Sequence, residues 1–528
     1  MNKKTLSHIC TLAALTMMTA ATFTACSSDD GNERDNWVPP VEPQYYTMTI
    51  QAMKGMDTRA LSYDDDTKEL KTTWEEGEIV KVYQSGEEIG ELTAAASDDA
   101  STTLTGEFAK APSTTAPLTF YFHTNKSTSY SDQDGTLKTI ASTYDSCEPA
   151  TVDAGDFEVD EKNHTISVPA GISFGANKQA IVRFRLQDSN GNKLSASTLL
   201  VKLGGKDIIV KPTDDGGLSE LYVAVPPVSN AKVKLYAIEA DVIFYHYTKT
   251  GVTFAAGKFY TITVKMKEGE TKNFTANQNQ HATLDDGDIL VGSINGDNEI
   301  KIADGATVML RDAHITSTLC AGITCLGDAT IVVANEEEDP NVITSASYGY
   351  PGIQVAADHT LTILGPGTLT ATGANGGANG GVNGGAGIGA GAGKNQTAGN
   401  IIIAGGTITA NGGSNAAGIG SGASSASSCG NILIKGGTVT AKGGASAAGI
   451  GSGYNSACGD ITITTGVTSV TATAGDAAKN SIGAGQGYAS CGTITIGCTL
   501  DENGNPVGGK EWHGGHGTGT YTYYPETE

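Results

Sequence analysis

The tetrapeptide Ala386-Gly387-Ile388-Gly389 decides the fold, because it returns as Ala417-Gly418-Ile419-Gly420 and as Ala448-Gly449-Ile450-Gly451. The pair Ile482-Gly483 continues the series, so successive isoleucines are 31, 31 and 32 residues apart. Earlier Gly-Ile pairs end at Ile323 and Ile353. This part of the chain is therefore built from a repeated unit.

Each unit also carries two short segments in which apolar and polar residues alternate. They lie at 400–403, 431–434, 460–463 and 493–496, and at 367–371, 406–410 and 437–441. Alternation bounded by Gly, Asn or Ser is typical of strands, so one unit is a coil of chain with three faces. No unit buries its own apolar face, so units must stack and pair between equivalent positions. The sequence predicts a right-handed parallel β-helix, with Ile419 and Ile450 inside adjacent coils.

Ionisable side chains are sparse in the repeats. Between residues 341 and 500, besides His359, the tyrosines and the cysteines, they are Asp358, Lys394, Lys435, Lys442, Asp460, Asp476 and Lys479. Such a surface does not attract nucleic acid, but it presents hydroxyl and amide groups at a regular pitch of about 4.8 Å. We expect a neutral polysaccharide or glycoconjugate as the partner, and no nucleic acid.

The N-terminus is typical of an export signal, with two lysines, a short apolar stretch and small residues before Cys26. The Ala25-Cys26 junction resembles a bacterial lipobox, with Phe23 where Leu is usual, and Cys26 would become the acylated first residue. We expect residues 1–25 to be a lipoprotein signal peptide; an ordinary signal peptide with an incidental cysteine is the alternative. The acidic segment 27–31 is similar to the tag that sends lipoproteins to the outer face of the outer membrane.

Cleavage would remove two lysines and no acidic residue, which moves the formal net charge from −24 to −26. This balance favours solubility and disfavours nucleic acid as a partner. No second apolar run approaches the roughly 18 residues that span a bilayer, so we expect attachment by lipid alone. Residues 26–44, with prolines at 39, 40 and 43, are predicted to be an extended tether.

Residues 45–269 are predicted to be all β. Short alternating segments such as 46–50, 79–83 and 180–185 are separated by turn signals such as 189–192, which favours antiparallel sandwiches. The segment is long enough for two. We place them at 45–165 and 166–269, followed by the repeats at 270–505 and a tail at 506–528.

Four segments in this region resemble the fimbrillin-like family: Thr58-Arg59-Ala60, the run from Trp74 to Tyr83, residues 89–93 and the closing strand 254–264 with its Ala-Gly-Lys-Phe-Tyr. The resemblance covers about 45–267. It implies surface lipoproteins with two transthyretin-like sandwiches that serve as stalk or tip subunits of pili. It also implies proteolysis near the N-terminus and strand exchange through the C-terminal region, leaving open whether the tether is processed.

The repeats bring a second resemblance. Residues 308–315, 321–323, 329–333 and 361–369 are similar to a carbohydrate-binding parallel β-helix family found on cellulose-degrading bacteria, over about 280–500. Repeat families match one another easily, so the fold is the firmer inference and sugar binding is a lead.

Four tyrosines are the candidate ligand-binding residues. Tyr454 and Tyr488 occupy nearly the same corner of adjacent coils, and Tyr348 and Tyr350 lie at another point of the repeats. Outward aromatic rings can stack on sugar rings, and packing at the corner is the alternative.

Other candidates have structural alternatives. We expect Cys429, Cys458 and Cys491, at equivalent positions of successive coils, to form a buried ladder of small side chains, although an exported protein permits disulfides. The acidic loops at 285–288 and 336–339 are either calcium ligands or solvated loops. The tail at 512–517 holds two histidines but an incomplete metal ligand set. No metal site and no cofactor are predicted.

Parallel β-helices also host polysaccharide lyases and hydrolases, which need convergent charge on one face. The later coils lack such charge, and only the first coils, with Arg311, Asp312, His314 and Asp328, hold enough ionisable groups. We therefore predict no catalytic residue, and an enzyme is the alternative. About 260 residues follow the closing sandwich strand and should obstruct polymerisation. We therefore expect an outer-membrane lipoprotein adhesin, acting as a fimbrial tip or alone, that contacts other fimbrial subunits if it joins a pilus; a structural or anchor subunit is the other alternative.

Overall fold

The structure is a computed structural model that describes residues 45–528, apart from 54–60, 65–68, 73, 75, 98–100, 123–129, 138, 141–148, 175–178, 215, 276–279, 337–338, 378–382, 393–396, 502 and 527–528. The signal peptide, Cys26 and the tether lie outside the described residues, so these predictions stay untested. Nearly all of the described secondary structure is β, which confirms the all-β class. Within the described residues, no helix has the length and apolar character to cross a membrane.

The first domain is a nine-stranded sheet with the order β8-β7-β4-β5-β6-β1-β10-β9, and β11 beside β1. Its strands are β1 (Tyr46–Met53), β4 (Ile79–Gln84), β5 (Glu87–Ala94), β6 (Ser101–Phe108), β7 (Leu118–Phe122), β8 (Ala150–Val152), β9 (Glu158–Asp160), β10 (Thr165–Ser167) and β11 (Ile172–Ser173). A separate hairpin pairs β2 (Leu61–Asp64) with β3 (Glu69–Thr72).

This domain ends later than the sequence suggested. Strands β10 and β11 pair with β1 in parallel, and Phe174 joins the same buried core, 6.3 Å from Trp74 and 5.7 Å from Phe122 between ring centroids. The boundary expected at 165 therefore falls after Phe174. The reason is that Ile166 and Ile172, which turn signals separate, both face this core.

The second domain has a three-stranded sheet, β15-β12-β18, and a five-stranded sheet, β14-β13-β16-β17-β19, around one buried cluster. The strands are β12 (Ala180–Gln187), β13 (Thr198–Leu203), β14 (Lys206–Val210), β15 (Glu220–Val225), β16 (Val228–Glu239), β17 (Ile243–Phe254), β18 (Phe259–Lys265) and β19 (Lys267–Glu268). The pairing is not purely antiparallel as expected, because the first and last long strands, β12 and β18, run in parallel.

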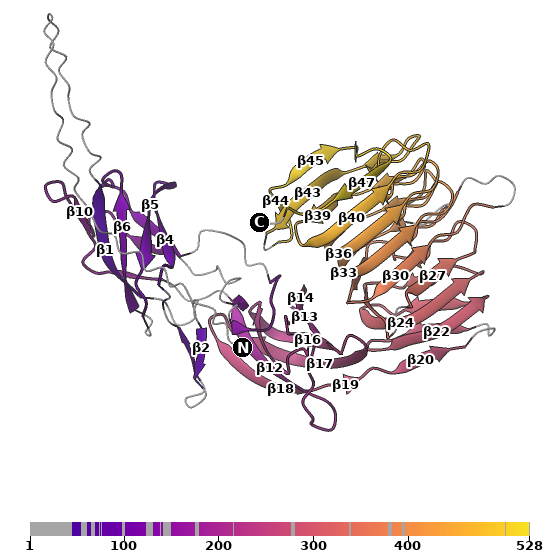
Figure 1. The fold of residues 1–528 in the computed structure, drawn as a ribbon, viewed down its shortest axis with the longest axis horizontal. Helices are drawn as coiled ribbons and strands as arrows, with labels where there is room; N and C mark the ends of the chain where they lie inside the picture. Colours follow the sequence, from indigo (N-terminus) through magenta and orange to yellow (C-terminus); the bar gives the residue numbers. More distant parts are fainter. Residues whose placement is uncertain are drawn as a thin grey trace, which may run out of the picture. The chain divides into compact units, whose positions relative to one another are not determined.

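The repeats form what we call the coil stack, residues 271–523, whose strands follow one another in order from β20 to β47 (Figure 1). One nine-stranded sheet contains the Gly-Ile strands, with the order β21-β23-β25-β28-β31-β34-β37-β41-β46. Their bounds are β21 (His281–Leu284), β23 (Glu299–Ile302), β25 (Ile323–Cys325), β28 (Ile353–Gln354), β31 (Ile388–Gly389), β34 (Ile419–Gly420), β37 (Ile450–Gly451), β41 (Ile482–Gly483) and β46 (Gly515–His516).

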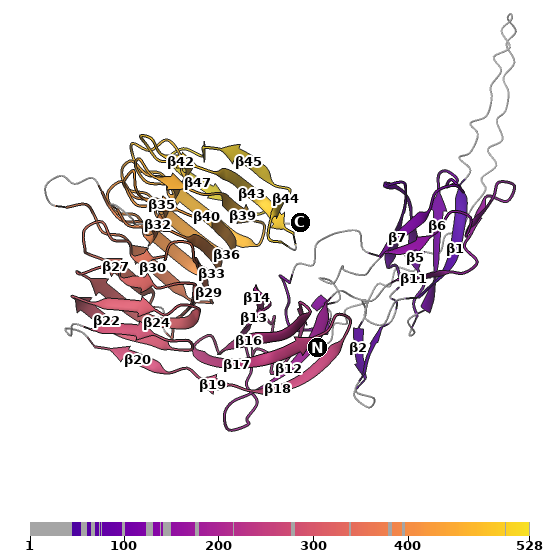
Figure 2. The same cartoon turned by 180° about the vertical axis from the view of Figure 1, so that it is seen from behind.

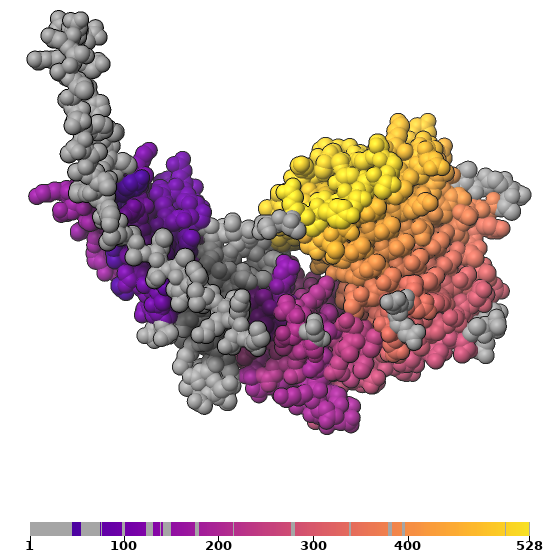
Figure 3. Space-filling view, viewed as in Figure 1, coloured from indigo at the N-terminus to yellow at the C-terminus, as the bar shows by residue number. Residues whose placement is uncertain are grey.

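A fifteen-stranded sheet holds the other two repeated segments. The N-terminal part of each long strand pairs with one short strand and the C-terminal part with another: β24 pairs with β26 and then β27, and β36 with β39 and then β40. The sheet therefore contains two parallel ladders. The strands are β20 (Thr271–Phe274), β22 (Ile289–Gly296), β24 (Ala306–Ser317), β26 (Ala329–Ala334), β27 (Asn341–Ser345), β29 (Thr360–Leu364), β30 (Thr368–Thr372), β33 (Asn400–Asn411), β36 (Ile432–Lys442), β39 (Ile461–Thr464), β40 (Val467–Thr473), β43 (Thr493–Leu500), β44 (Pro506–Val507), β45 (Lys510–His513) and β47 (Thr520–Tyr523). In the space-filling view the colours pass in order from pink to yellow along the stack (Figure 3).

The pairing explains the Gly-Ile-Gly repeat. Ile419 is the parallel partner of Ile450, and both side chains are fully buried, so the prediction that they are interior residues of adjacent coils is confirmed. The following glycine must lack a side chain: Gly420 has φ of 136°, and a Cβ there would lie 1.8 Å from the carbonyl oxygen of Gly451. Only glycine tolerates both conditions.

Two features were not foreseen. A four-stranded parallel ladder of two-residue strands, β32 (Thr397–Ala398), β35 (Ser428–Cys429), β38 (Ala457–Cys458) and β42 (Ser490–Cys491), adds a further short face, visible from behind (Figure 2). The expected tail instead belongs to the stack, because β45, β46 and β47 pair antiparallel with β43, β41 and β40. A terminal cap of this kind covers the strand edges that the last coil would otherwise expose.

Candidate functional site

The four predicted tyrosines lie along one edge of the coil stack. In the β28 coil, the carbonyl of Gly349, between Tyr348 and Tyr350, accepts a hydrogen bond from the backbone N of Ala392, at 2.7 Å. Tyr454 lies four residues after Ile450, just as Ala392 lies four residues after Ile388. Its backbone N donates the equivalent hydrogen bond, to the carbonyl of Asn415 at 2.9 Å. The coils at this edge follow one another in the order β28-β31-β34-β37-β41. The edge therefore spans four inter-strand spacings, a length of about 19 Å.

The four rings differ in exposure. Tyr488 is 96% exposed and Tyr348 is 65% exposed, whereas Tyr350 and Tyr454 are half-buried. Tyr454 lies against the next coil, since a Cβ on Gly487 would come within 3.1 Å of its Cε2 atom. The backbone N of Tyr488 donates to Oδ1 of Asn455 at 2.8 Å, which fixes the turn that carries the exposed ring. The edge therefore offers two exposed rings and two half-buried ones, and their ligand binding stays a prediction.

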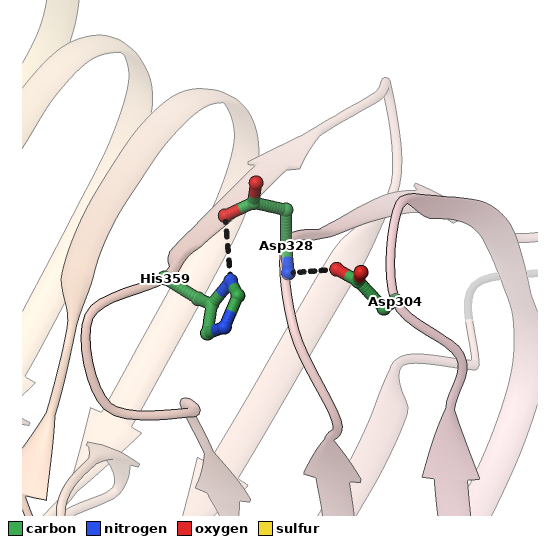
Figure 4. Close-up of side chains that lie close together, drawn as sticks. All are labelled: Asp304, Asp328 and His359. Atoms are coloured by element: carbon green, nitrogen blue, oxygen red, sulfur yellow. Dashed lines mark hydrogen bonds and ion pairs between the residues drawn. The ribbon is translucent and has the colours of Figure 1, made fainter.

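A group of Asp304, Asp328 and His359 brings its ligand atoms within 4.8 Å of one another, as Figure 4 shows. Within the described residues this is the one cluster with the geometry to hold a metal ion, and the sequence did not indicate it. Nδ1 of His359 lies 3.4 Å from Oδ1 of Asp328, and Oδ1 of Asp304 accepts from the backbone N of Asp328 at 2.9 Å. Both aspartates are exposed.

The same atoms have a structural role. Oδ1 of Asp328 accepts from the backbone N of Thr360 at 2.8 Å, Oδ1 of Asn400 from Asn431 at 2.9 Å, and Oδ1 of Asn431 from Asp460 at 2.9 Å. We call Asp328, Asn400, Asn431 and Asp460 the Asx ladder. Each side chain caps a backbone N–H in the following coil, so the acidic cluster is the lower part of a ladder that holds coils together.

The charged residues of the first coils do not converge. Asp328 lies level with Gly305 at one end of β24, whereas Arg311 pairs with Ala334 about 20 Å along the strand. Arg311 contacts Glu336 at 3.3 Å and the carbonyl of Val242 at 3.2 Å. His314 instead contacts Asp339 and the carbonyl of Pro340, at 3.3 and 3.0 Å. Arg311 and Asp312 thus share Glu336, whose backbone N donates to Asp312 at 3.3 Å, whereas His314 and Asp328 have other partners.

The three cysteines stack as expected. Cys458 is the parallel partner of both Cys429 and Cys491, and the six cysteines in the described residues are free. Cys429 and Cys458 are buried, and Cys491 is half-buried. The hydrogen-bonded neighbour Cys429 raises the pKa of the Cys458 thiol well above its ordinary value. The Cys458 thiol is therefore protonated at neutral pH.

The tail histidine at 516 packs among aromatic rings, 3.8 Å from Trp512 and 4.5 Å from Tyr521 between centroids. Burial lowers the pKa of His516. His513, by contrast, is exposed. His516 therefore packs among the aromatic rings of the cap.

In the acidic loop 285–288, Asp285 is exposed, whereas Asp286 and Asp288 make contacts within the protein. Asp286 accepts from the hydroxyl of Tyr236 at 2.6 Å and from the backbone N of Thr307 at 2.9 Å, and Lys234 lies 3.0 Å away. Asp288 is 6% exposed and accepts from the backbone N of Asp285 at 2.8 Å. The sequence did not indicate this use, because the side-chain partners Tyr236 and Lys234 lie about 50 residues upstream. In the other acidic loop, Glu337 and Glu338 lie outside the described residues.

Asp286 belongs to a junction between the second sandwich and the stack. An apolar cluster spans it, containing Leu200, Tyr236, Ile238 and Phe244 on one side and Ile289, Met309, Val332, Ala334, Leu364 and Ala404 on the other. Beside this cluster lies a pocket of about 420 Å³ that sequence reasoning missed.

No family model matches the chain, and no curated protein matches it. Solved structures with some similarity include the shaft pilin SpaA from Lactobacillus rhamnosus GG, at 8% identity and a TM-score of 0.23, over 43% of this chain and 98% of that chain. The Bacillus anthracis TIE protein matches at 11% identity and 0.14, over 46% and 36%. The pilus adhesin SpaC from Lactobacillus rhamnosus GG matches at 12% identity and 0.13, over 44% and 30%. With TM-scores below 0.5, these likenesses carry no argument about function.

Proposed function

We propose that the protein is a cell-surface lipoprotein adhesin that binds a neutral polysaccharide without catalysis. In this proposal the sandwiches are transthyretin-like and belong with the fimbrillin-like proteins, the coil stack is a right-handed parallel β-helix, and Cys26 carries the lipid. The stack presents the ligand-binding edge, and the sandwiches connect it to the outer membrane and, if a pilus forms, to other fimbrial subunits.

The observation that carries the proposal is the alignment of Tyr348, Tyr350, Tyr454 and Tyr488 along one edge. A polymer chain needs repeated contacts along its length, and stacked coils repeat every 4.8 Å or so. Aromatic faces gain contact area with sugar rings without requiring charge. The coils that carry these tyrosines are built from Thr, Ser, Asn and Gly, which supply hydrogen-bonding groups beside the rings.

The connection between sandwich and stack favours a tip or stand-alone subunit over a stalk subunit. The closing strand β18 pairs with β12, and β19 and β20 follow within a few residues. Strand exchange through this region would have to separate β18 from its sandwich while the stack remains attached to its end. The junction contacts of Tyr236 and Asp286 add to that cost.

The test is affinity electrophoresis of the full chain in gels containing starch, a mixed-linkage β-glucan or a galactomannan, at low salt and at 1 M NaCl. We expect retardation by one of these polymers that persists at high salt, because the contacts are uncharged. Replacing Tyr348 and Tyr488 together by Ala should weaken retention about tenfold or more, since an aromatic contact contributes about 0.5–1.5 kcal/mol. Tyr524→Ala, which removes a 69% exposed ring outside this edge, is the matched control.

Each other outcome selects an alternative. Release of soluble sugar products would make the protein an enzyme, and absence of retardation in every polymer would leave a structural or anchor subunit. Full retention by the double variant would move the binding site to another face.

A further inference from the structure

The pocket at the junction lies between the β13–β14 hairpin and the outer face of the stack. The hairpin contributes Lys202, Lys206 and Asp207, and the stack contributes Asp328, Thr330, Thr362 and Lys435. Its volume of about 420 Å³ is in the range of small-molecule sites. No residue of the tyrosine edge lines it.

Lysine ammonium groups gather here although the chain as a whole has a net charge of −24. Lys202 is already satisfied, because its Nζ lies 2.6 Å from Oδ2 of Asp207 and 2.9 Å from Oγ1 of Thr330. Lys211 follows the same hairpin, and its Nζ would lie 3.4 Å from a Cβ built on Gly405 of the stack. The ammonium group of Lys211 thus also faces the junction.

Lys435 differs from the other lysines of the pocket in its backbone position and in its lack of a partner among the described residues. The β33–β36 ladder shifts register between Ile403 and Ala404, where Ile434 and Gly436 are the partners, so Lys435 is the extra residue of a β-bulge. A bulge redirects a side chain out of the regular alternation. Within the described part of the chain, Lys435 has neither a hydrogen bond nor an ion pair from its side chain, and burial lowers its pKa.

A half-buried ammonium without a partner is costly, and an anion that reaches it recovers charge-assisted hydrogen bonds. Asp207 is engaged by Lys202, which leaves Lys435 without a nearby carboxylate bond of its own. Thr330, Thr362 and Ile402 also line the pocket, and their hydroxyl and apolar groups suit a ligand that carries hydroxyls and a ring.

We propose that this pocket binds a sugar-sized ligand through an anionic group, a carboxylate or a sulfate, that contacts Lys435 and Lys206. The site is separate from the tyrosine edge and adds an acidic ligand to the neutral polymer of the proposed function. The two differ in one measurable respect: binding at the pocket depends on charge and weakens with salt.

The experiment is isothermal titration of the full chain with a galacturonic acid trimer, a neutral galactose trimer and inorganic sulfate, at 20 mM and 500 mM NaCl. We expect the acidic trimer to bind and the neutral trimer not to bind at this site, with affinity falling at the higher salt. Lys435→Met should weaken binding at least tenfold, and Lys206→Gln should weaken it as well. Lys442→Met, on the same strand but exposed, should bind as the parent does.

Sulfate that competes with the acidic trimer supports a shared anion position, and sulfate that binds while the trimer does not assigns the position to a sulfate group. Equal binding of acidic and neutral trimers, no binding of any probe, or unchanged affinity in both Lys435→Met and Lys206→Gln would overturn the proposal. The variant lacking Tyr348 and Tyr488 should keep this binding, so the two sites fail or succeed independently.

Discussion

The hydroxyl of Tyr236 donates a 2.6 Å hydrogen bond to Oδ1 of Asp286 and so joins the second sandwich to the first coils of the stack. The same oxygen accepts from the backbone N of Thr307, and Lys234 neutralises the other carboxylate oxygen. Burial opposes ionisation here, but the hydrogen bonds from Tyr236, Thr307 and Lys234 together hold the pKa of Asp286 below its ordinary value. Asp286 is thus ionised at neutral pH.

Tyr236→Phe should lower the free energy of unfolding by about 1–3 kcal/mol, because it leaves a half-buried carboxylate oxygen with one donor fewer. Tyr245→Phe is the control, since the Tyr245 hydroxyl is 3.4 Å from Glu239 and makes a weaker contact. Chemical denaturation at pH 7 measures both. Equal losses for the two variants would show that the Asp286 contact has no special weight.

The stabilisation from Asp286 should depend on pH. A carboxyl whose pKa is lower in the folded chain stabilises the fold above its unfolded value, and this contribution is lost as the pH falls through the folded value. The parent should therefore lose its advantage over Asp286→Asn as the pH drops below about 3.8, the ordinary value for aspartate. Melting temperatures of both proteins between pH 7 and pH 2.5 test this. A difference that stays constant across the range would contradict it.

Ile450→Asp should destabilise the stack by several kcal/mol, because it buries a carboxylate between Ile419 and Ile482 where nothing pairs with it. Thr440→Asp, at an exposed position of β36, is the matched control and should stay within about 0.5 kcal/mol of the parent. Thermal melting followed by circular dichroism distinguishes them. If Ile450→Asp melted like the control, the coil register would be wrong.

The Asx ladder makes a narrower prediction. Asn431→Ala removes the acceptor for the backbone N of Asp460 and should cost about 1–3 kcal/mol, whereas Asn431→Asp keeps that oxygen and should cost less. Hydrogen exchange at the Asp460 amide gives a local measurement. Protection that is the same in both variants would show that the cap does not hold the coils.

The repeats could be read from the sequence because each coil has the same local demands. An isoleucine that points inward and a glycine that the next coil touches recur at one spacing, so Ile419 and Gly420 identify their own partners in Ile450 and Gly451. The same spacing predicted that Tyr454 and Tyr488 occupy similar corners of adjacent coils, but it put Tyr348 and Tyr350 at another point of the repeats. Contacts between non-equivalent segments leave no periodic signal.

The junction, the pocket and the acidic cluster are formed by contacts between non-equivalent segments, which the repeat does not reveal. Asp286 meets Tyr236, and Lys435 comes to line one pocket with Lys202 and Thr330, only after the outer face of the stack packs on the sandwich. The sandwich boundary was misplaced for a related reason: Phe174 packs on Trp74, a hundred residues earlier. Short turn-rich segments look like linkers until such a distant partner is known.

Cys26 should carry the membrane attachment. Because residues 1–25 read as a lipoprotein signal, Cys26→Ser should release the protein into the medium or leave it soluble in the periplasm. Cell fractionation with immunoblotting measures the distribution, and Cys491→Ser, far from the N-terminus, controls for the loss of a thiol. Unchanged membrane association of Cys26→Ser would overturn the lipid anchor.

Lys435 should make the fold less stable at neutral pH than a neutral side chain would. Burial lowers the pKa of Lys435 from its ordinary 10.5, so the unfolded chain holds that proton more tightly than the folded chain does. Stability then rises with pH across the interval between the folded pKa and 10.5.

Lys435→Met removes the titrating group and should melt at a higher temperature than the parent at pH 7 in a buffer without added anions. The gap should narrow as the pH approaches 10.5. Lys442→Met, which removes an exposed side chain from the same strand, is the control for the substitution itself. A gap that did not change with pH would mean that the ammonium group of Lys435 is as well solvated in the folded protein as in the unfolded chain.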